Sequence, residues 1–276
     1  MIRNPIIKQV TQFFPGRESA VEMACATVLA GGHLLIEGMP GLGKTRLAEK
    51  IAKAFGLPFS RIQMTADLLP SDITGSMIYN PAKTDFVFFP GPIFADMVLI
   101  DEINRAPPRT QSALIECMAN RRVTVATKTH DLPRHFMVIA TANPSIDDGA
   151  YGLPLAILDR FMARVVLERP GPKEEAGILV RYGMDEVNEV EEAPKHWDWR
   201  QVRASIHAVH LSDDLARAVV KEADKRREKG IAISVRAGIH AVMLAKSMAW
   251  LKDRDFVTPE DIHQVIPHVF DHRSAS

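Results

Sequence analysis

Residues 38–45 read Gly-Met-Pro-Gly-Leu-Gly-Lys-Thr and match the pattern G-x-x-x-x-G-K-[ST]. Glycines in this pattern let consecutive backbone N–H groups point inward around a phosphate group at a helix N-terminus. Lys44 adds a positive charge, and the Thr45 hydroxyl can ligate Mg²⁺. An ordinary glycine turn is the alternative, but the segment lies between an apolar run and a stretch with helical spacing. The residues that we predict to bind phosphate are Gly38, Met39, Pro40, Gly41, Leu42, Gly43, Lys44, Thr45 and Arg46.

Two carboxylates follow the apolar run 97–100, which has the composition of a buried parallel strand. Asp101 and Glu102 are then expected at the carboxyl edge of the sheet, beside the phosphate-binding loop. There Asp101 would hold Mg²⁺ through water, and Glu102 would accept a proton from an attacking water. A solvated strand end is the alternative for the pair taken alone. Together with the loop, the pair predicts a nucleoside triphosphatase with ATP and Mg²⁺ as its ligands.

Three further polar residues are candidates for the same reaction. Asn143 follows the apolar run 136–142 and would orient the water or contact the γ-phosphate, although a plain Asn-Pro turn is the alternative. Arg160 follows Asp159 between apolar residues, a pattern that also fits a local surface ion pair. Arg236 lies near the start of a predicted helix and would point to solvent or to a phosphate. We predict that all three take part in catalysis, together with Lys44 and Glu102.

The periodicity of the chain predicts the elements that position these residues. Residues 1–170 alternate apolar strands with helical patterns and predict an α/β core with a parallel sheet. Two hairpins are expected, at 76–94 and 121–133. The pattern breaks at Pro170-Gly171-Pro172, and residues 171–276 predict a small all-α domain. Its expected helices are 173–182, 198–210, 212–229, 234–250 and 258–270, with a Glu-rich loop at 183–197.

The composition is that of an ordinary globular protein. The chain has 276 residues, 46% of them hydrophobic, and 34 basic residues balance 34 acidic ones, so we expect no nucleic-acid partner. Cys25 and Cys117 lie in apolar helical patterns and are expected to be reduced core residues. No apolar run has the length of a membrane span, and the first residues lack the apolar stretch of a signal peptide, which predicts a cytoplasmic protein.

These residues resemble the motifs of AAA+ ATPases, and within that superfamily those of the MoxR family. Residues 38–45, residues 97–102, Asn143 and Arg236 are similar to the Walker A, Walker B, sensor 1 and sensor 2 motifs, in the same order. The segments that resemble MoxR signatures are 68–75, 101–111, 158–161 and 257–261. The resemblance covers the chain from about residue 14 to residue 273.

By this resemblance the fold is expected to be a P-loop NTPase core, AAA+ in type, followed by a helical lid. Residues 76–94 would be a helix-2 insert and residues 123–136 a pre-sensor hairpin. The implied activity is Mg²⁺-dependent ATP hydrolysis in a homo-oligomer, expected to be a hexamer, in which Arg160 is an arginine finger that reaches a neighbouring subunit's nucleotide. The implied partners are a protein client that is remodelled and a protein with a von Willebrand factor A domain.

The chain departs from the usual family pattern at three places. Ala142 stands where Gln is common, and Leu155 stands where a carboxylate is common. The second difference removes a carboxylate that would contact a neighbouring subunit. The segment before Arg236 also reads Ser-Val-Arg in place of the commoner Ser-Pro-Arg.

Two other functions are compatible with the same motifs. A DNA motor of the related helicase clade would need exposed cations on an inserted hairpin, and the candidates are Arg121, Arg122 and Lys128. The other possibility is a scaffold that binds ATP in order to assemble and hydrolyses it slowly. Salt-sensitive DNA binding would favour the first, whereas function of a Glu102→Gln protein in the host would favour the second.

Overall fold

The computed structural model describes residues 3–82, 84–143, 151–183 and 198–273. Its centre is a five-stranded parallel sheet with the strand order β2-β5-β8-β1-β9. The strands are β1 (His33–Glu37), β2 (Phe59–Gln63), β5 (Met97–Asp101), β8 (Met137–Ala142) and β9 (Phe161–Val166). All residues of β5 and β8 are buried, which explains their continuous apolar runs. The α/β class with a parallel sheet, predicted from the sequence, is confirmed.

Helices cover both faces of this sheet, because alternate residues of a strand point to opposite faces. Leu34 and Ile36 belong to the core shared with the first three helices, whereas Leu35 belongs to the core of the other face. The helices on the first face are α1 (Arg3–Thr11), α2 (Glu18–Leu29) and α3 (Lys44–Phe55). Those on the second face are α4 (Pro70–Thr74), α5 (Pro108–Asn120) and α6 (Leu155–Leu158).

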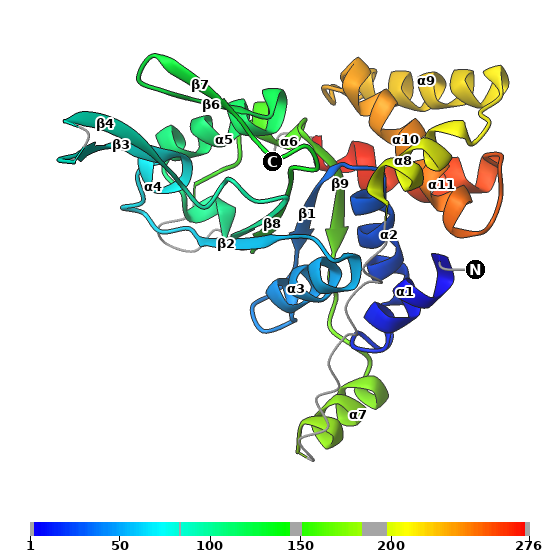
Figure 1. Cartoon of the computed structure of the whole chain (residues 1–276). Helices are drawn as coiled ribbons and strands as arrows, with labels where there is room; N and C mark the ends of the chain where they lie inside the picture. The colour runs from blue at the N-terminus through cyan, green and yellow to red at the C-terminus, as the bar shows by residue number, and fades with distance from the viewer. Residues whose placement is uncertain (1–2, 83, 144–150, 184–197, 274–276) are drawn as a thin grey trace.

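Two antiparallel hairpins extend from one end of the sheet (Figure 1). The first pairs β3 (Gly75–Asn80) with β4 (Asp85–Pro90), and the second pairs β6 (Arg122–Val125) with β7 (Lys128–Asp131). The hairpins contact each other through stacked rings of Phe88 and His130, whose centroids are 3.9 Å apart. The first hairpin exposes several large apolar side chains, namely Ile78, Tyr79, Phe86, Val87 and Phe89.

The C-terminal third of the chain is helical. Its elements are α7 (Pro172–Gly183), α8 (Trp199–Ala208), α9 (Asp213–Arg227), α10 (Val235–Leu251), α11 (Pro259–Phe270) and the 3₁₀ turn η2 (Asp271–Arg273). Helix α11 begins with a capping box, in which the Thr258 hydroxyl accepts a hydrogen bond from Asp261 N and the Asp261 carboxylate accepts one from Thr258 N. We call residues 198–273, which contain helices α8–α11 and η2, the lid. The predicted Glu-rich loop lies mostly outside the described residues.

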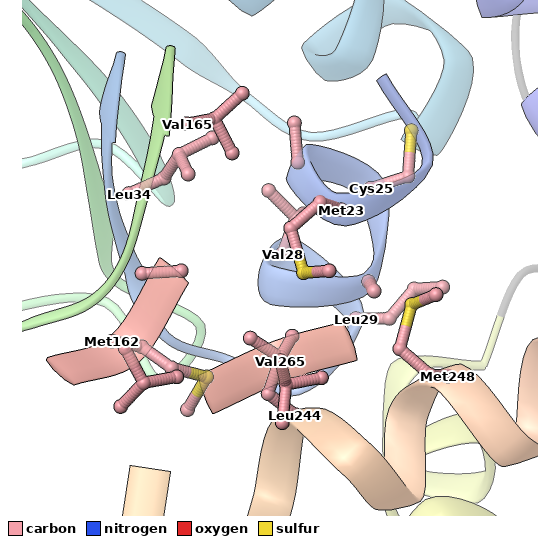
Figure 2. Packing of buried hydrophobic residues seen from close by; sticks show 14 of the residues in the cluster. Met23, Cys25, Val28, Leu29, Leu34, Met162, Val165, Leu244, Met248 and Val265 are labelled. Carbon is pink, nitrogen blue, oxygen red and sulfur yellow. The ribbon is translucent and has the colours of Figure 1, made fainter. Parts of the chain in front are cut away.

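The lid shares one hydrophobic core with the sheet. Figure 2 shows helix α2 between the strands and the lid, with Met23 and Val28 directed into the packed layer. Leu244 and Met248 of α10 and Val265 of α11 pack into the same cluster. A buried hydrogen bond from Ser247 Oγ to Ala26 O, 2.8 Å long, also joins α10 to α2. The lid is therefore fastened to the core through α2 and β9.

The structure corrects two details of the sequence prediction. The apolar run 164–167 predicts the last core strand, but this strand begins at Phe161, so Asp159 and Arg160 lie directly before it. Helical spacing in 46–55 predicts the helix after the phosphate loop, but this helix begins at Lys44, so Lys44 and Thr45 belong to its first turn. The cysteine prediction is confirmed, because Cys25 and Cys117 are free and buried, and burial raises the pKa of each thiol to about 12.

Candidate active site

The loop between β1 and α3 is shaped by glycines. Gly43 has φ +87° and caps α3 with its backbone in the left-handed region, which favours glycine. A Cβ on Gly38 would lie 2.5 Å from the carbonyl oxygen of Leu167, so the loop passes too close to the end of β9 for any side chain. Met39 is exposed at the front of the loop, and the Leu42 carbonyl accepts a hydrogen bond of 2.9 Å from the Arg17 side chain.

Lys44 is the buried cation of this loop. Its Nζ donates hydrogen bonds to Gly38 O at 2.6 Å, Met39 O at 3.0 Å and Asn143 Oδ1 at 2.8 Å. Burial lowers the pKa of Lys44, while the nearby carboxylates of Asp101 and Glu102 raise it and oppose that shift. The ammonium group is therefore held under the loop in a position where a phosphate oxygen would meet it.

Asp101 lies beside the loop and accepts hydrogen bonds from three side chains. Its carboxylate accepts hydrogen bonds from Thr45 Oγ1 at 3.0 and 3.2 Å, from Thr141 Oγ1 at 2.5 Å and from Arg61 at 2.7 Å. Hydroxyl and carboxylate oxygens are the donors that Mg²⁺ prefers, so Thr45 and Asp101 fit a magnesium ion. The Arg61 guanidinium, with its side chain 48% exposed, contacts the same carboxylate that the ion would use.

Glu102 directly follows Asp101, and the backbone leaves the direction of β5 at this residue. Its φ is +56°, an uncommon value for a residue other than glycine, and its N–H donates to Thr141 Oγ1 at 2.9 Å. The side chain accepts a hydrogen bond of 3.1 Å from Gln63 and forms an ion pair of 3.0 Å with Arg105. The carboxylate is thus held near the phosphate loop by two polar neighbours.

These groups surround one cavity of about 750 Å³ at the carboxyl edge of the sheet. Its walls contain the phosphate loop, the first turn of α3 with Arg46, the end of β2, the carboxylate pair and Asn143. Arg46 also faces Phe13, with its guanidinium carbon 5.8 Å from the ring centroid. The structure therefore brings together nine of the predicted site residues: Pro40, Gly41, Gly43, Lys44, Thr45, Arg46, Asp101, Glu102 and Asn143.

The two predicted arginines lie elsewhere. Arg160 and Arg236 line a separate cavity of about 350 Å³, together with Gly32 and His33 at the start of β1. The phosphate loop follows the other end of β1, about 13 Å away along the strand at 3.3 Å per residue. Arg236 therefore does not point to the phosphate loop of its own subunit. The two arginines are neighbours, and burial together with the charge of Arg236 lowers the pKa of Arg160.

The surface ion pair between Asp159 and Arg160, the alternative to a catalytic Arg160, is not among the ion pairs of the described residues. Asp159 pairs instead with Arg236 at 2.7 Å and with Arg273 at 3.0 Å. The Arg160 guanidinium donates to Ala156 O at 2.5 Å, and its buried Nε has no partner within the described part of the chain. Among the described residues, the Arg160 guanidinium thus has no carboxylate bonded to it.

Four further residues contact the carboxylate pair and are not among the predicted site residues: Arg61, Gln63, Arg105 and Thr141. Arg61 and Gln63 lie two apart on β2, a spacing that puts both side chains on the same face of an edge strand. Gln63 is directly opposite Asp101 in the register with β5. Polar residues at every second position of a short strand are the signal that could identify Arg61 and Gln63.

Comparisons with known proteins agree with this architecture. The family model described as "ATPase family associated with various cellular activities (AAA)" matches residues 33–163, and an AAA lid domain model matches residues 223–275. A crystal structure of a candidate ATPase from Cytophaga hutchinsonii superposes with a TM-score of 0.86 and 36% identity, covering 99% of this chain and 87% of that one. The fold and the site thus define a nucleotide-binding AAA+ ATPase.

Relatives narrow the assignment further. Chaperone MoxR1 of Mycobacterium tuberculosis is 36% identical over 278 residues, which are 97% of this chain and 74% of the relative. The uncharacterized protein YeaC of Bacillus subtilis is 36% identical over 271 residues, 97% of this chain and 85% of the relative. The chain belongs to the MoxR family of AAA+ ATPases. Across the residues that the structure describes, none of the helices is long and apolar enough to cross a bilayer.

Proposed function

We propose that this protein hydrolyses ATP in a homo-oligomeric ring, expected to contain six subunits, and that the cycle remodels a protein client in the manner of a chaperone. The observation that carries the proposal is the separation of Arg160 and Arg236 from Lys44 by the length of β1. In each subunit the phosphate-binding residues and the two arginines line separate cavities. Rotation of one subunit onto the next in a closed ring would bring the two halves together.

Each residue of the phosphate cavity has a defined part in this proposal. Lys44 and the loop N–H groups hold the phosphates, and Asn143 orients both Lys44 and the attacking water. Thr45 and Asp101 hold Mg²⁺, which when bound neutralises charge on the β- and γ-phosphates. Glu102 accepts the proton of the attacking water once its contacts with Gln63 and Arg105 rearrange.

Arg160 and Arg236 then complete the site of the neighbouring subunit. An arginine supplied in trans is worth about 10³ to 10⁵ in rate, because it stabilises the charge of the transition state. The nearby Arg236 belongs to the lid, so the position of the lid would set how the pair meets the phosphate. Movement of the lid during the cycle is the step that we assign to client remodelling.

The partners are proposed on the same basis. The mycobacterial relative is named Chaperone MoxR1, which supports a protein client for this chain. The exposed apolar side chains of the β3–β4 hairpin, such as Phe86 and Phe89, supply a surface of matching character. A partner with a von Willebrand factor A domain and an insert role for the hairpins remain proposals from the family. The domain boundary near residue 170 is a proposal as well.

One observation weakens the DNA-motor alternative. Arg122, a cation of the β6–β7 hairpin, pairs with Asp131 of the same hairpin at 3.0 Å. Arg121 lines the cavity that contains Arg160 and donates a hydrogen bond to Arg134 O at 3.3 Å. Neither residue is arranged as part of a continuous basic strip along the hairpin, which phosphate-backbone binding would require.

The experiment that tests the proposal measures ATP hydrolysis by Arg160→Ala and Glu102→Gln proteins, alone and mixed. Each variant alone is expected to be nearly inactive. In a 1:1 mixture about one site in four combines an intact Glu102 with a neighbour's intact Arg160, so activity should return to roughly a quarter of wild type. Wild-type turnover by either variant alone would contradict its catalytic role, and a mixture as inactive as its components would contradict action between subunits.

A further inference from the structure

Asp159 lies at the joint between the sheet and the lid. Its carboxylate accepts hydrogen bonds from Ser234 Oγ at 2.6 Å, from Arg236 at 2.7 Å and from Arg273 at 3.0 Å. Ser234 and Arg236 are at the N-terminus of α10, whereas Arg273 is the last residue of η2, so three lid residues converge on one carboxylate of the core.

Arg273 is fixed at this joint by an ion pair with Asp159 and by hydrogen bonds to backbone carbonyls. Arg273 is 1% exposed, and its guanidinium donates to the backbone carbonyls of Asp159, Phe161 and Val269. A buried guanidinium is costly unless it is paired and hydrogen-bonded, and Asp159 supplies the compensating charge. Burial alone would raise the pKa of Asp159, but hydrogen bonds from Ser234 and Arg273 outweigh this and lower it. The carboxylate therefore stays charged at neutral pH.

Asp159 also explains how two arginines can share one cavity. Arg160 and Arg236 repel each other, since each carries a positive charge and both line the same space. The Asp159 carboxylate holds Arg236 by an ion pair, directly precedes Arg160 in the chain, and carries a charge that raises the pKa of Arg160. The side chain of Arg236 is 47% exposed, so without this partner its long side chain would have little to fix its direction.

We propose that Asp159 is a positioning residue that aligns the Arg160 and Arg236 pair for the neighbouring subunit and couples that alignment to the position of the lid. This inference rests on the proposed function, in which the pair acts between subunits. It assigns to the acidic residue a role distinct from those of the two arginines, because Asp159 contacts Arg236, Arg273 and Ser234 and not the phosphate cavity.

The inference predicts a defect in the arginine pair and not in the subunit's own nucleotide site. Asp159→Asn keeps a hydrogen-bond acceptor of similar size but removes the charge. A misplacement of about 1 Å at a reacting group can cost about 10²-fold in rate. We expect kcat to fall about 10- to 100-fold, with the KM for ATP within about twofold of wild type, because Lys44, Thr45 and Asp101 are untouched.

The test compares full-length Asp159→Asn, Asp159→Glu and Ser247→Ala proteins, each alone and in a 1:1 mixture with Glu102→Gln. Ser247→Ala is the matched control, because it removes a buried bond between lid and core that lies outside the arginine cavity. We expect it to keep kcat within about twofold of wild type. Asp159→Glu retains the charge and should recover part of the kcat lost in Asp159→Asn. Thermal melting and binding of a fluorescent ATP analogue establish that each variant is folded.

Recovery in the mixture distinguishes positioning between subunits from a general loss of structure. A Glu102→Gln neighbour would supply an intact arginine pair to the Asp159→Asn subunit, so activity should return as it does for Arg160→Ala. If Arg160→Ala recovers and Asp159→Asn does not, or if Asp159→Asn keeps wild-type kcat, the inference is overturned while the proposed function stands. If Arg160→Ala itself does not recover, the proposed function fails and this inference fails with it. Should Asp159→Asn not fold, Asp159→Glu is judged by the same recovery.

Discussion

Gly38→Ala tests whether the close approach of two chain segments shapes the phosphate loop. Gly38 directly follows β1 and is the first residue of the loop, and an added Cβ would lie 2.5 Å from the Leu167 carbonyl oxygen. Ordinary contacts begin near 3.4 Å, so one of the two segments must move by about 0.9 Å. Leu167 N also donates a 2.7 Å hydrogen bond to Glu37 O, and this bond joins β9 to the end of β1. The methyl group would therefore strain the backbone on both sides.

The expected cost follows from these contacts. Overpacking against backbone costs about 1 to 3 kcal/mol, and weakening the hydrogen bond between Leu167 and Glu37 adds about 1 kcal/mol. We expect Gly38→Ala to lower the free energy of unfolding by about 3 kcal/mol. Gly41→Ala is the matched control, because a Cβ there meets nothing within 4 Å and its φ of +80° alone costs about 1 kcal/mol.

Urea unfolding of the nucleotide-free proteins measures this difference, and titration with a fluorescent ATP analogue reports on the loop itself. Gly38→Ala should show the larger loss of stability and should bind the analogue more weakly than Gly41→Ala does. If Gly38→Ala were as stable as Gly41→Ala, or bound the analogue equally well, the close approach to Leu167 would not determine the geometry of the loop.

Two further predictions concern charge. Arg61→Ala removes the guanidinium that pairs with the Asp101 carboxylate, and an exposed ion pair is worth up to about 1 kcal/mol. The nucleotide-bound variant should therefore bind Mg²⁺ roughly two- to fivefold more tightly than wild type, as measured by the fluorescence of the bound ATP analogue. Unchanged or weaker Mg²⁺ binding would contradict this prediction. Burial lowers the pKa of His33 to about 4. Burial together with the charge of Arg273 lowers the pKa values of His240 and His272 to about 3. Below about pH 6.5 the unfolded chain therefore binds more protons than the folded one. Stability should therefore fall by up to about 3 kcal/mol between pH 6.5 and 5.5, about 1 kcal/mol for each histidine, and equal urea midpoints at the two pH values would exclude buried neutral histidines.

The phosphate cavity was within reach of sequence reasoning because its parts are local motifs. Lys44 and Thr45 follow one strand, Asp101 and Glu102 end a second, and Asn143 follows a third. In a parallel sheet the carboxyl ends of the strands meet at one edge, so three separate runs predict one site. The order of β1, β5 and β8 at the centre of the sheet satisfies that expectation.

The joint at Asp159 was beyond sequence reasoning for a physical reason. Its partners Ser234, Arg236 and Arg273 are 75, 77 and 114 residues away in the chain, and their meeting depends on how the lid packs against α2 and β9. Periodicity predicts a helix and its buried face but not the helix of another domain that it will contact. The neighbouring Arg160 therefore suggested a local ion pair that the packing does not form.

Arg61 is an intermediate case. Its place on β2 and its side of the strand follow from the period of two, but its contact with Asp101 requires β2 and β5 to be neighbours. The sequence alone does not determine the strand order. Residues that act through a neighbouring strand are thus predictable only after the topology is known.

The most direct test of the account measures the mass of Glu102→Gln protein by mass photometry, with and without Mg²⁺ and ATP, while filter binding verifies that ATP is bound. The account predicts a shift from the 30.6 kDa monomer to about six times that mass when ATP is present. The same shift should accompany recovery of activity in mixtures with Arg160→Ala. A protein that binds ATP and remains a 30.6 kDa monomer would contradict the central claim that Arg160 and Arg236 complete a neighbour's site.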